Sequence, residues 1–262
     1  MARLRADLHT HSHYSRDSVL SPEAYVDACV RKGITCAAVT DHNEVRGAFV
    51  IQELALRQAQ GELKVIVGEE VKTAEGEIVG LFLKELVPNG MSAEDTIRAI
   101  KEQGGVVIVP HPFDVFRRNV IKRETLERVI GKVDAIEGYN CRNILPRHDA
   151  KARALAAKAG KPISVASDAH SRWEIGGVYI EMDGFENTEE FLRALAGGVV
   201  RFRRSLPMVH WISTYAKIRW RLGLRPHFTS QPLDGPVPPG LGASGPTGPD
   251  AKAQATTATK PE

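Results

Sequence analysis

Short apolar runs alternate with helical patterns through the first 195 residues, and this alternation constrains the fold more than any other feature of the chain. The apolar runs have the length and composition of buried strands, and glycine follows four of the helical patterns, where a left-handed residue ends a helix. We expect strands at Leu4–Leu8, Ile34–Thr40, Leu63–Val67, Ile78–Leu83, Val106–Val109, Ala135–Tyr139 and Ile163–Ala166. We expect helices at Pro22–Arg31, Gly47–Gln58, Ser92–Glu102, Arg123–Ile130, Pro146–Lys158 and Thr188–Leu195. This alternation of strands and helices predicts βα units that form a largely parallel sheet. We expect the sheet to be closed or nearly closed, as in a TIM-like α/β barrel.

The chain divides by composition into three parts, residues 1–198, 199–225 and 226–262. Residues 191–262 hold ten Lys and Arg against three Asp and Glu, whereas the net charge of the whole chain is only +3. We therefore expect the barrel over 1–198, followed by a basic amphipathic extension over 199–225. Residues 226–262 are rich in Pro, Gly, Ala, Thr and Ser, and they hold too few large apolar side chains to offset the entropy of ordering. This tail is predicted to be disordered.

The basic extension has two interpretations. In one, the Arg, Lys, Trp and Tyr side chains between residues 201 and 225 contact nucleic acid or an anionic membrane. In the other, an apolar helix face packs on the barrel and the charges stay in water. We favour packing, because the helical periodicity between residues 208 and 222 gives an apolar face. The residues of that face are Val209, Ile212, Ile218 and Leu222.

Composition also indicates where the protein works. No run of eighteen apolar residues is present, so no membrane-spanning helix is expected. The N-terminal sequence lacks the apolar stretch of a secretory signal. The three cysteines, Cys29, Cys36 and Cys141, follow no metal-binding spacing and favour a reducing compartment over a disulfide scaffold. We expect a cytoplasmic protein.

Side chains that can bind metals follow the expected strands, at the point where each strand ends. Six strands each deliver an imidazole, a carboxylate or an amide. In chain order these residues are His9, His11, Asp41, His42, Glu69, Glu70, His111, Asn140, Asp168 and His170. Because the carboxyl ends of parallel strands meet on one face of a barrel, we expect these side chains to share one pocket.

The spacing of these residues indicates which metals they bind. Residues i and i+2 of an extended chain point to the same side, so His9 and His11 can hold one ion, and so can Asp168 and His170. Mixed imidazoles and carboxylates suit Zn, Mn or Fe better than Ca. The ligands are too many for one tetrahedral ion. The sequence therefore predicts two or three divalent ions bridged by a carboxylate, with Glu70 as the natural bridge.

Five segments in this order, DLHTHSHYSRDS, VTDHN, GEEV, PHP and ASDAH, resemble the motifs of the PHP (polymerase and histidinol phosphatase) family of metal-dependent phosphoesterases. The resemblance spans residues 7 to about 180, and it implies a distorted (β/α)7 barrel with two or three metal ions. The family's Gly-x-Glu pattern selects Glu70 rather than Glu69. The motifs imply one set of ligands for each of three ions. The first ion would be held by His9, His11, Glu70 and Asp168, and the second by Glu70, His111 and a residue near Asn140. The third would be held by Asp17, His42 and His170.

Such a centre predicts hydrolysis of a phosphate ester by a water molecule that the metal ions activate. The pocket is anionic before metal binding, so the substrate phosphate needs a positive group. By position, the candidates are Arg16, Arg117, Arg118 and Arg142. Asp41 is expected to orient His42 or His11 without binding metal itself.

Within the resemblance, the short form without a polymerase domain favours nucleoside phosphates or short oligonucleotides as substrates. A phosphatase acting on histidinol phosphate is the enzymatic alternative. From a different class, the chain would be a non-catalytic module that keeps metals for structure and binds nucleic acid or a membrane through its basic extension. The complete set of metal ligands argues against this last interpretation.

Overall fold

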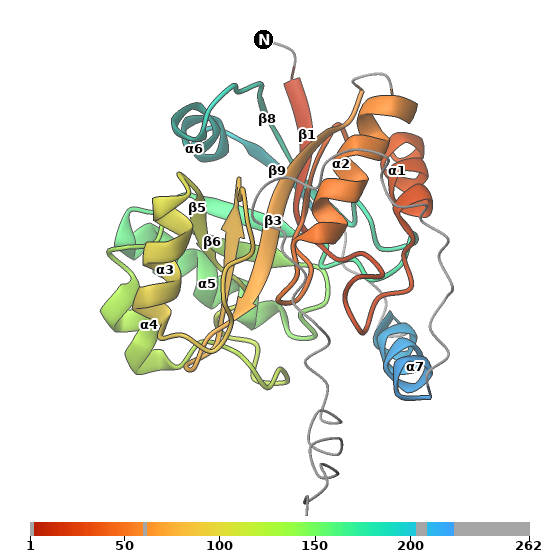
Figure 1. The fold of residues 1–262 in the computed structure, drawn as a ribbon. Helices are drawn as coiled ribbons and strands as arrows, with labels where there is room; N and C mark the ends of the chain where they lie inside the picture. The colour runs from red at the N-terminus through yellow and green to blue at the C-terminus, as the bar shows by residue number, and fades with distance from the viewer. Residues whose placement is uncertain (1–2, 60–61, 203–208, 223–262) are drawn as a thin grey trace, which may run out of the picture. The chain divides into compact units, whose positions relative to one another are not determined.

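The computed structural model describes residues 3–59, 62–202 and 209–222 of the chain (Figure 1). Within these ranges, nine strands form one sheet in the order β7-β6-β5-β4-β3-β2-β1-β8-β9. The strands are β1 Arg3–Thr10, β2 Cys36–Val39, β3 Lys64–Lys72, β4 Glu77–Leu81, β5 Val106–Val109, β6 Ala135–Asn140, β7 Ile163–Ala166, β8 Val178–Asp183 and β9 Val199–Phe202. The helices are α1 Pro22–Arg31, α2 Arg46–Gln58, α3 Ala93–Glu102, α4 Arg123–Val129, α5 Pro146–Ala159, α6 Thr188–Ala196 and α7 Val209–Arg221.

The sheet contains two parallel groups, β1-β2-β3 and β5-β6-β7, joined by a strand of opposite direction. That strand is β4, which is antiparallel to both β3 and β5. The reason is the connection before it, because a tight turn from Thr73 to Gly76 leads from β3 to β4 in place of a helix. Strands β8 and β9, which the sequence analysis did not predict, continue the sheet antiparallel beyond β1.

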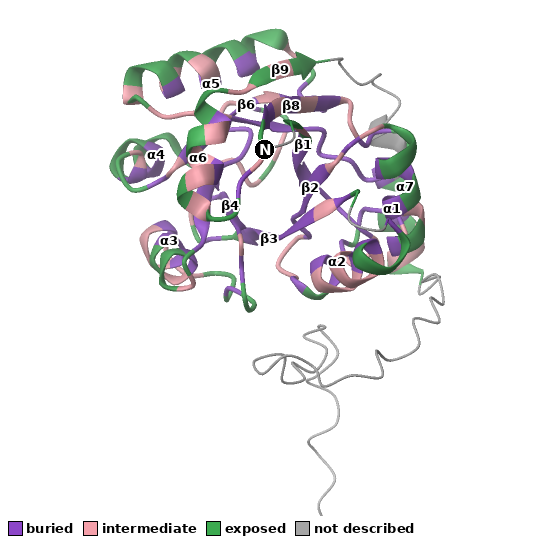
Figure 2. Ribbon diagram, turned by 90° about the horizontal axis from the view of Figure 1, so that it is seen from above, coloured by how far each residue is buried: buried purple, intermediate pink, exposed green. Residues whose placement is uncertain are grey.

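The two ends of the parallel array meet, so the sheet is nearly closed. Thr10 at the end of β1 forms a parallel bridge with Ala169, just after β7. The N–H of His11 donates to the Ala169 carbonyl at 2.9 Å, and the N–H of Asp168 donates to the His9 carbonyl at 2.9 Å. Figure 2 shows the buried strands enclosed by helices whose outer faces are exposed. The predicted α/β barrel is confirmed.

The helices begin and end where the sequence analysis placed them, to within one or two residues. Ser21 caps α1 by accepting a hydrogen bond from the Ala24 N–H at 3.2 Å. Gly33, Gly104 and Gly160 follow three helices in the left-handed conformation, which glycine adopts without steric cost. Gly61, predicted to do the same, lies outside the described residues.

The C-terminal extension differs from its prediction. Residues 199–202, which we assigned to the extension, form β9 and pair with β8. In α7, Ser213 and Ala216 are buried, whereas Ile218 and Leu222 are 51% and 66% exposed. The helix therefore packs through its small residues and not through the apolar face that we predicted at these two positions. The side chains of Val209 and Ile212 and the whole predicted tail lie outside the described residues, and no described helix is long and apolar enough to cross a membrane.

Candidate metal centre

The ends of β1, β2, β3, β5 and β7 bring imidazoles and carboxylates to one place. Of the residues gathered there, only His42 is partly exposed, and the rest are buried. The gathered residues are His9, His11, Asp17, His42, Glu70, His111, Asp168 and His170.

Glu70 is the central carboxylate of this group. Its Oε1 lies 2.9 Å from His111 Nε2. Its Oε2 lies 2.9 Å from His42 Nδ1 and 3.5 Å from the Nε2 atoms of both His9 and His11. Four imidazoles from three separate segments thus surround one carboxylate. This arrangement is the one expected of a carboxylate that bridges metal ions.

Two aspartates complete the group on the side of His170. Asp17 Oδ1 lies 3.4 Å from His170 Nε2 and 3.6 Å from His42 Nε2. Asp168 Oδ1 lies 3.4 Å from His11 Nε2 and 3.5 Å from His170 Nδ1. His11 therefore stands between the glutamate and the second aspartate.

The donor atoms in this pocket fit a set of divalent cations. Glu70 Oε2, Asp17 Oδ1 and Asp168 Oδ1 are buried acceptors with no hydrogen bond among the described residues. The inward Nε2 atoms of His9 and His11 are only 3.1 Å apart. Within three overlapping groups, all the candidate ligand atoms lie within 4.8 Å of one another. These groups are His9–His11–Glu70, His11–His42–His170 and His42–Glu70–Glu77.

Glu70, His11 and Asp168 are each held in the protonation state that metal binding requires. Burial alone would raise the pKa of Glu70, but the charges of His9 and His42 hold it well below its ordinary value. Burial and the positive charges of His170 and His42 lower the pKa of His11, so its ring is neutral and can offer a lone pair. Burial would raise the pKa of Asp168, but the Arg117 guanidinium and the neighbouring histidines together hold it well below its ordinary value.

Glu137 on β6 orients two of the histidines, and the sequence analysis did not single it out. His9 Nδ1 donates to Glu137 Oε2 at 2.8 Å, which leaves His9 Nε2 free to face the centre. Glu137 Oε1 accepts from the His111 N–H at 3.0 Å and from Asn140 Nδ2 at 2.8 Å. The Asn140 amide also donates to Asp168 Oδ2, and its oxygen accepts from the Arg142 N–H. Asn140, predicted to stand at a ligand position, thus ties carboxylates together instead of presenting its oxygen to the centre.

Asp41 is linked to the same centre through Ser15. Its carboxylate accepts hydrogen bonds at 2.6 Å from the hydroxyls of Ser12 and Ser15. Because the Ser15 hydroxyl proton is directed to Asp41, its oxygen can accept from His11 Nδ1 at 3.2 Å and from the His42 N–H at 3.1 Å. The Nε2 lone pair of His11 is thereby directed inward. Asp41 lies where the prediction of an orienting role requires it, with Ser15 as the unforeseen link.

The adjacent glutamates of β3 face opposite ways. Glu70 faces the centre, whereas Glu69 is buried on the other side and accepts a hydrogen bond from the Val87 N–H at 2.9 Å. Glu77 is an additional acid that the sequence analysis missed, with Oε2 at 3.9 Å from His111 Nε2. It begins β4, whereas the predicted ligands follow the ends of strands. The start of an antiparallel strand lies at the same edge as the ends of its parallel neighbours, so the direction of β4 brings Glu77 to the site.

The four arginines predicted to bind phosphate have different surroundings. Arg117 forms ion pairs with Asp114 and with Asp168. Arg142 is buried and contacts His170, Ser213 and Glu174. Arg118 is exposed, and Arg16 is exposed with its guanidinium 5.8 Å from the Trp220 ring centre. The two arginines nearest the centre are therefore occupied by its own residues.

Two of the candidate ligands have an unusual backbone. His111 has φ of +28° and Asp168 has φ of +54°, a region that side chains other than glycine rarely adopt. Each residue lies two positions after the carboxyl end of its strand, where the chain must turn sharply to aim the side chain inward. Such conformations cost about 1–3 kcal/mol each and concentrate at functional sites.

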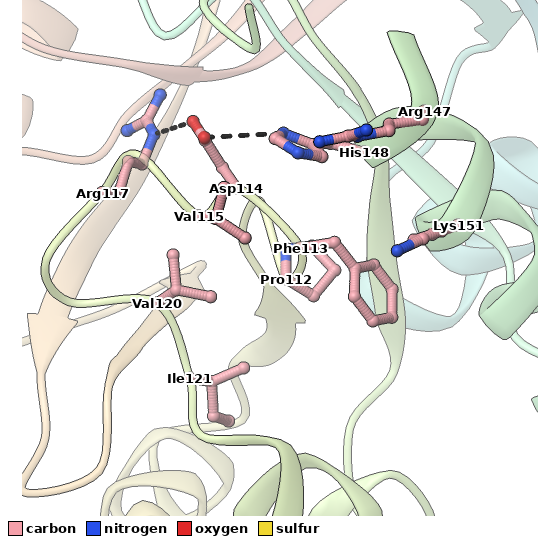
Figure 3. Close-up of a pocket in the computed structure, with 10 residues that line it drawn as sticks. All are labelled: Pro112, Phe113, Asp114, Val115, Arg117, Val120, Ile121, Arg147, His148 and Lys151. Carbon is pink, nitrogen blue, oxygen red and sulfur yellow. Dashed lines mark hydrogen bonds and ion pairs between the residues drawn. The ribbon is translucent and has the colours of Figure 1, made fainter. Parts of the chain in front are cut away.

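A cavity of about 390 Å³ lies beside the centre, between the loop after β5 and the first turns of α5 (Figure 3). Phe113 and Val115 supply apolar walls, and Arg147 and Lys151 supply positive charge without a hydrogen bond or ion pair to the described residues. Figure 3 shows Asp114 between Arg117 and His148. Because Arg117 also contacts Asp168, this cavity adjoins the metal centre.

The fold and the site together define an α/β barrel protein with a candidate metal centre at the carboxyl ends of its parallel strands. The model of the PHP domain family matches residues 7–159, and that of the PHP-associated family matches residues 146–200. The chain therefore belongs to the PHP domain family.

Relatives and solved structures are consistent with this membership. The uncharacterized protein MJ0417 of Methanocaldococcus jannaschii is 31% identical over 84% of this chain and 90% of its own length. MJ1587 of the same organism is 42% identical over 42% of this chain and 68% of its own length.

The fold also resembles that of solved proteins at 16% identity. PsfC of Pseudomonas syringae aligns with a TM-score of 0.60 over 86% of this chain and 100% of that chain. A solved protein of Bifidobacterium adolescentis aligns with a TM-score of 0.56 over 74% of this chain and 96% of that chain.

Proposed function

We propose that this protein hydrolyses a phosphomonoester or phosphodiester, with a nucleoside phosphate or a short oligonucleotide as substrate. The observation that carries the proposal is the convergence of four imidazoles on Glu70, flanked by Asp17 and Asp168. Two or three ions of Mn, Fe or Zn would be held by these residues. The assignment of ligands is His9, His11, Glu70 and Asp168 for one ion, Glu70 and His111 for a second, and Asp17, His42 and His170 for a third.

The chain's own residues prepare this site for phosphate chemistry. When bound, divalent ions supply a nucleophile at neutral pH and neutralise the phosphoryl oxygens. Glu137 holds a proton on His9 Nδ1, and Ser15 does the same for His11 Nδ1, so that both Nε2 atoms face inward. Arg117 balances the charge of Asp168. A serine or cysteine nucleophile is not required by this arrangement.

The adjoining cavity supports a substrate larger than a simple phosphate. Its volume of about 390 Å³ lies within the usual range for small-molecule pockets. Phe113 offers an apolar surface for a flat ring, and Arg147 and Lys151 offer cations for a further anionic group. An ester with a nucleoside as its alcohol matches both features.

Hydrolysis of p-nitrophenyl phosphate and bis-p-nitrophenyl phosphate with Mn tests the activity. We expect p-nitrophenol release that a chelator abolishes and that His9→Ala and Glu70→Gln reduce at least 100-fold, in line with the loss of a metal ligand. Glu69→Gln is the matched control, because it changes the neighbouring glutamate that faces away, and it should retain activity.

The proposal is wrong if the metal-loaded protein releases p-nitrophenol from neither ester, or if release is indifferent to both the chelator and His9→Ala. The same assay with nucleoside monophosphates, a dinucleotide and histidinol phosphate compares the substrate classes directly. Faster turnover of histidinol phosphate than of any nucleotide would contradict the substrate proposed here.

A further inference from the structure

Helix α7 is anchored directly to residues of the metal centre. Arg142 donates a hydrogen bond to the Ser213 hydroxyl at 2.7 Å, and both side chains are buried. The same guanidinium lies 2.8 Å from His170 Nδ1 and 3.3 Å from Glu174 Oε1. Ala216, one turn further along α7, is buried as well. This acid-free helix is thus part of the wall of the site.

Lys217 of α7 contacts a candidate metal ligand. Its Nζ lies 3.3 Å from Asp17 Oδ2, while the other oxygen of Asp17 faces His42 and His170. The Lys217 side chain is 58% exposed, so the ammonium stands at the open side of the centre and not within it. Arg16, next to Asp17 in sequence, lies against Trp220 of the same helix. Helix α7 therefore places the Lys217 ammonium beside Asp17 and also contacts Arg16, the preceding residue in the sequence.

The centre is rich in negative charge, which a cation at its edge can offset. Glu70, Asp168, Glu137 and Glu174 are buried acids at or beside it, and a phosphate ester brings further negative charge. The guanidinium groups of Arg117 and Arg142 are already paired with Asp168 and Glu174. Among the described cations with a contact to a candidate ligand, Lys217 has the exposed, flexible side chain that can turn from a carboxylate to an arriving phosphoryl oxygen.

We propose that Lys217 binds the substrate phosphate and that α7 is a component of the active site. The inference rests on the proposed phosphoesterase function and adds a residue outside the five family motifs. Asp17 lies between the two histidines His42 and His170 on one side and Lys217 on the other. A phosphoryl group bound next to Asp17 would therefore lie within reach of the Lys217 ammonium. The alternative is an ion pair that only holds Asp17 in place.

Three variants separate these roles in the full-length, Mn-loaded protein. Lys217→Gln removes the charge, and Lys217→Arg keeps it. Arg219→Gln is the matched control, because it removes a charge from the same helix at a guanidinium that lies over Tyr215, 5.7 Å from the ring centre. The measurements are the affinity for inorganic phosphate by calorimetry, the Mn content, and KM and kcat for p-nitrophenyl phosphate.

We expect Lys217→Gln to weaken phosphate binding and raise KM about 10-fold, with Mn content and kcat little changed. Lys217→Arg should retain most of the affinity, and Arg219→Gln should match the unmodified protein. Equal phosphate affinity in Lys217→Gln and Arg219→Gln would overturn the proposal, and so would a loss of Mn from Lys217→Gln. If no ester is hydrolysed but Lys217→Gln still weakens phosphate binding, the proposed function fails, whereas the assignment of Lys217 as a phosphate-binding residue stands.

Discussion

At the scale of single residues, the two glutamates of β3 show how adjacent positions of one strand can have different chemical environments, because they face opposite sides of the sheet. Glu70 is surrounded by imidazoles that keep it ionised, whereas Glu69 is buried away from the centre with a single hydrogen bond from the Val87 N–H. Burial raises the pKa of Glu69 to about 8, against the smaller opposing effect of that hydrogen bond. Glu69 is therefore protonated in the folded protein at neutral pH.

This difference predicts how stability depends on pH. The folded pKa of Glu69 lies above its unfolded value of 4.5, so its contribution is fully present below pH 4.5 and is lost as pH rises through about 8. Glu69→Gln removes this dependence because an amide does not ionise. From urea unfolding between pH 5 and 8.5, we expect the variant to gain stability relative to the unmodified protein as pH rises, by up to about 1.4 kcal/mol per pH unit. A constant difference across this range would show that Glu69 does not titrate in this way.

At the scale of elements, the first turn of α2 packs against the loop that orients His11. A Cβ atom added to Gly47 would contact the Asp41 carboxylate and would lie 2.7 Å from Ser12 Oγ. Both atoms are buried and hydrogen-bonded to each other, so neither can move aside freely. Helix α2 can approach this loop only because residue 47 has no side chain.

Gly47→Ala should therefore damage both stability and the metal site. We expect a loss of about 1–3 kcal/mol in the free energy of unfolding, since overpacking of a filled interior costs this much. Mn affinity measured by calorimetry should fall too, because a displaced Asp41 no longer fixes Ser15 and His11. Gly131→Ala is the control, because its added Cβ would meet no atom within 4 Å. Equal behaviour of the two variants would refute this account of α2.

The elements also show what can be predicted from the sequence. Buried apolar runs and capping residues such as Ser21 are local features, so the first seven strands, six helices and the histidines after the strands were predicted well. The direction of β4 depends on a turn that replaces a helix. Because this direction was not predicted, Glu77 at the start of β4 was not recognised as a residue of the site. The exposed strand β9 lacks the apolar run that marks the others. Glu137 and Lys217 contact the centre only through tertiary packing, for which the sequence carries no periodic pattern.

At the scale of the whole molecule, the centre joins the first and last parallel strands. His9 and His11 come from β1 and its end, and Asp168 and His170 follow β7. Their backbones also form the hydrogen bonds that close the barrel. Cations bound by these side chains would connect both sides of this seam, so metal binding and barrel stability should be coupled.

Metal addition should therefore raise the melting temperature. At a concentration 100 times the dissociation constant, one ion adds about 2.7 kcal/mol to stability, which for a protein of this size corresponds to a rise of about 5–10 °C. Thermal unfolding followed by circular dichroism, with Mn or with a chelator, measures this shift. His9→Ala should show a smaller shift than the unmodified protein. Identical melting temperatures with Mn and with chelator would contradict the coupling.

The seam between β1 and the segment after β7 has a consequence for biosynthesis. The Ser167 N–H donates to Asp7 Oδ1 across 160 residues, next to the places where the histidines and aspartate meet. A ribosome releases the early histidines long before Asp168 and His170 have been translated. A nascent chain that has reached His111 therefore carries six of the eight gathered residues and still lacks Asp168 and His170. We expect the full set of metal ions to bind only when synthesis of the barrel is nearly finished.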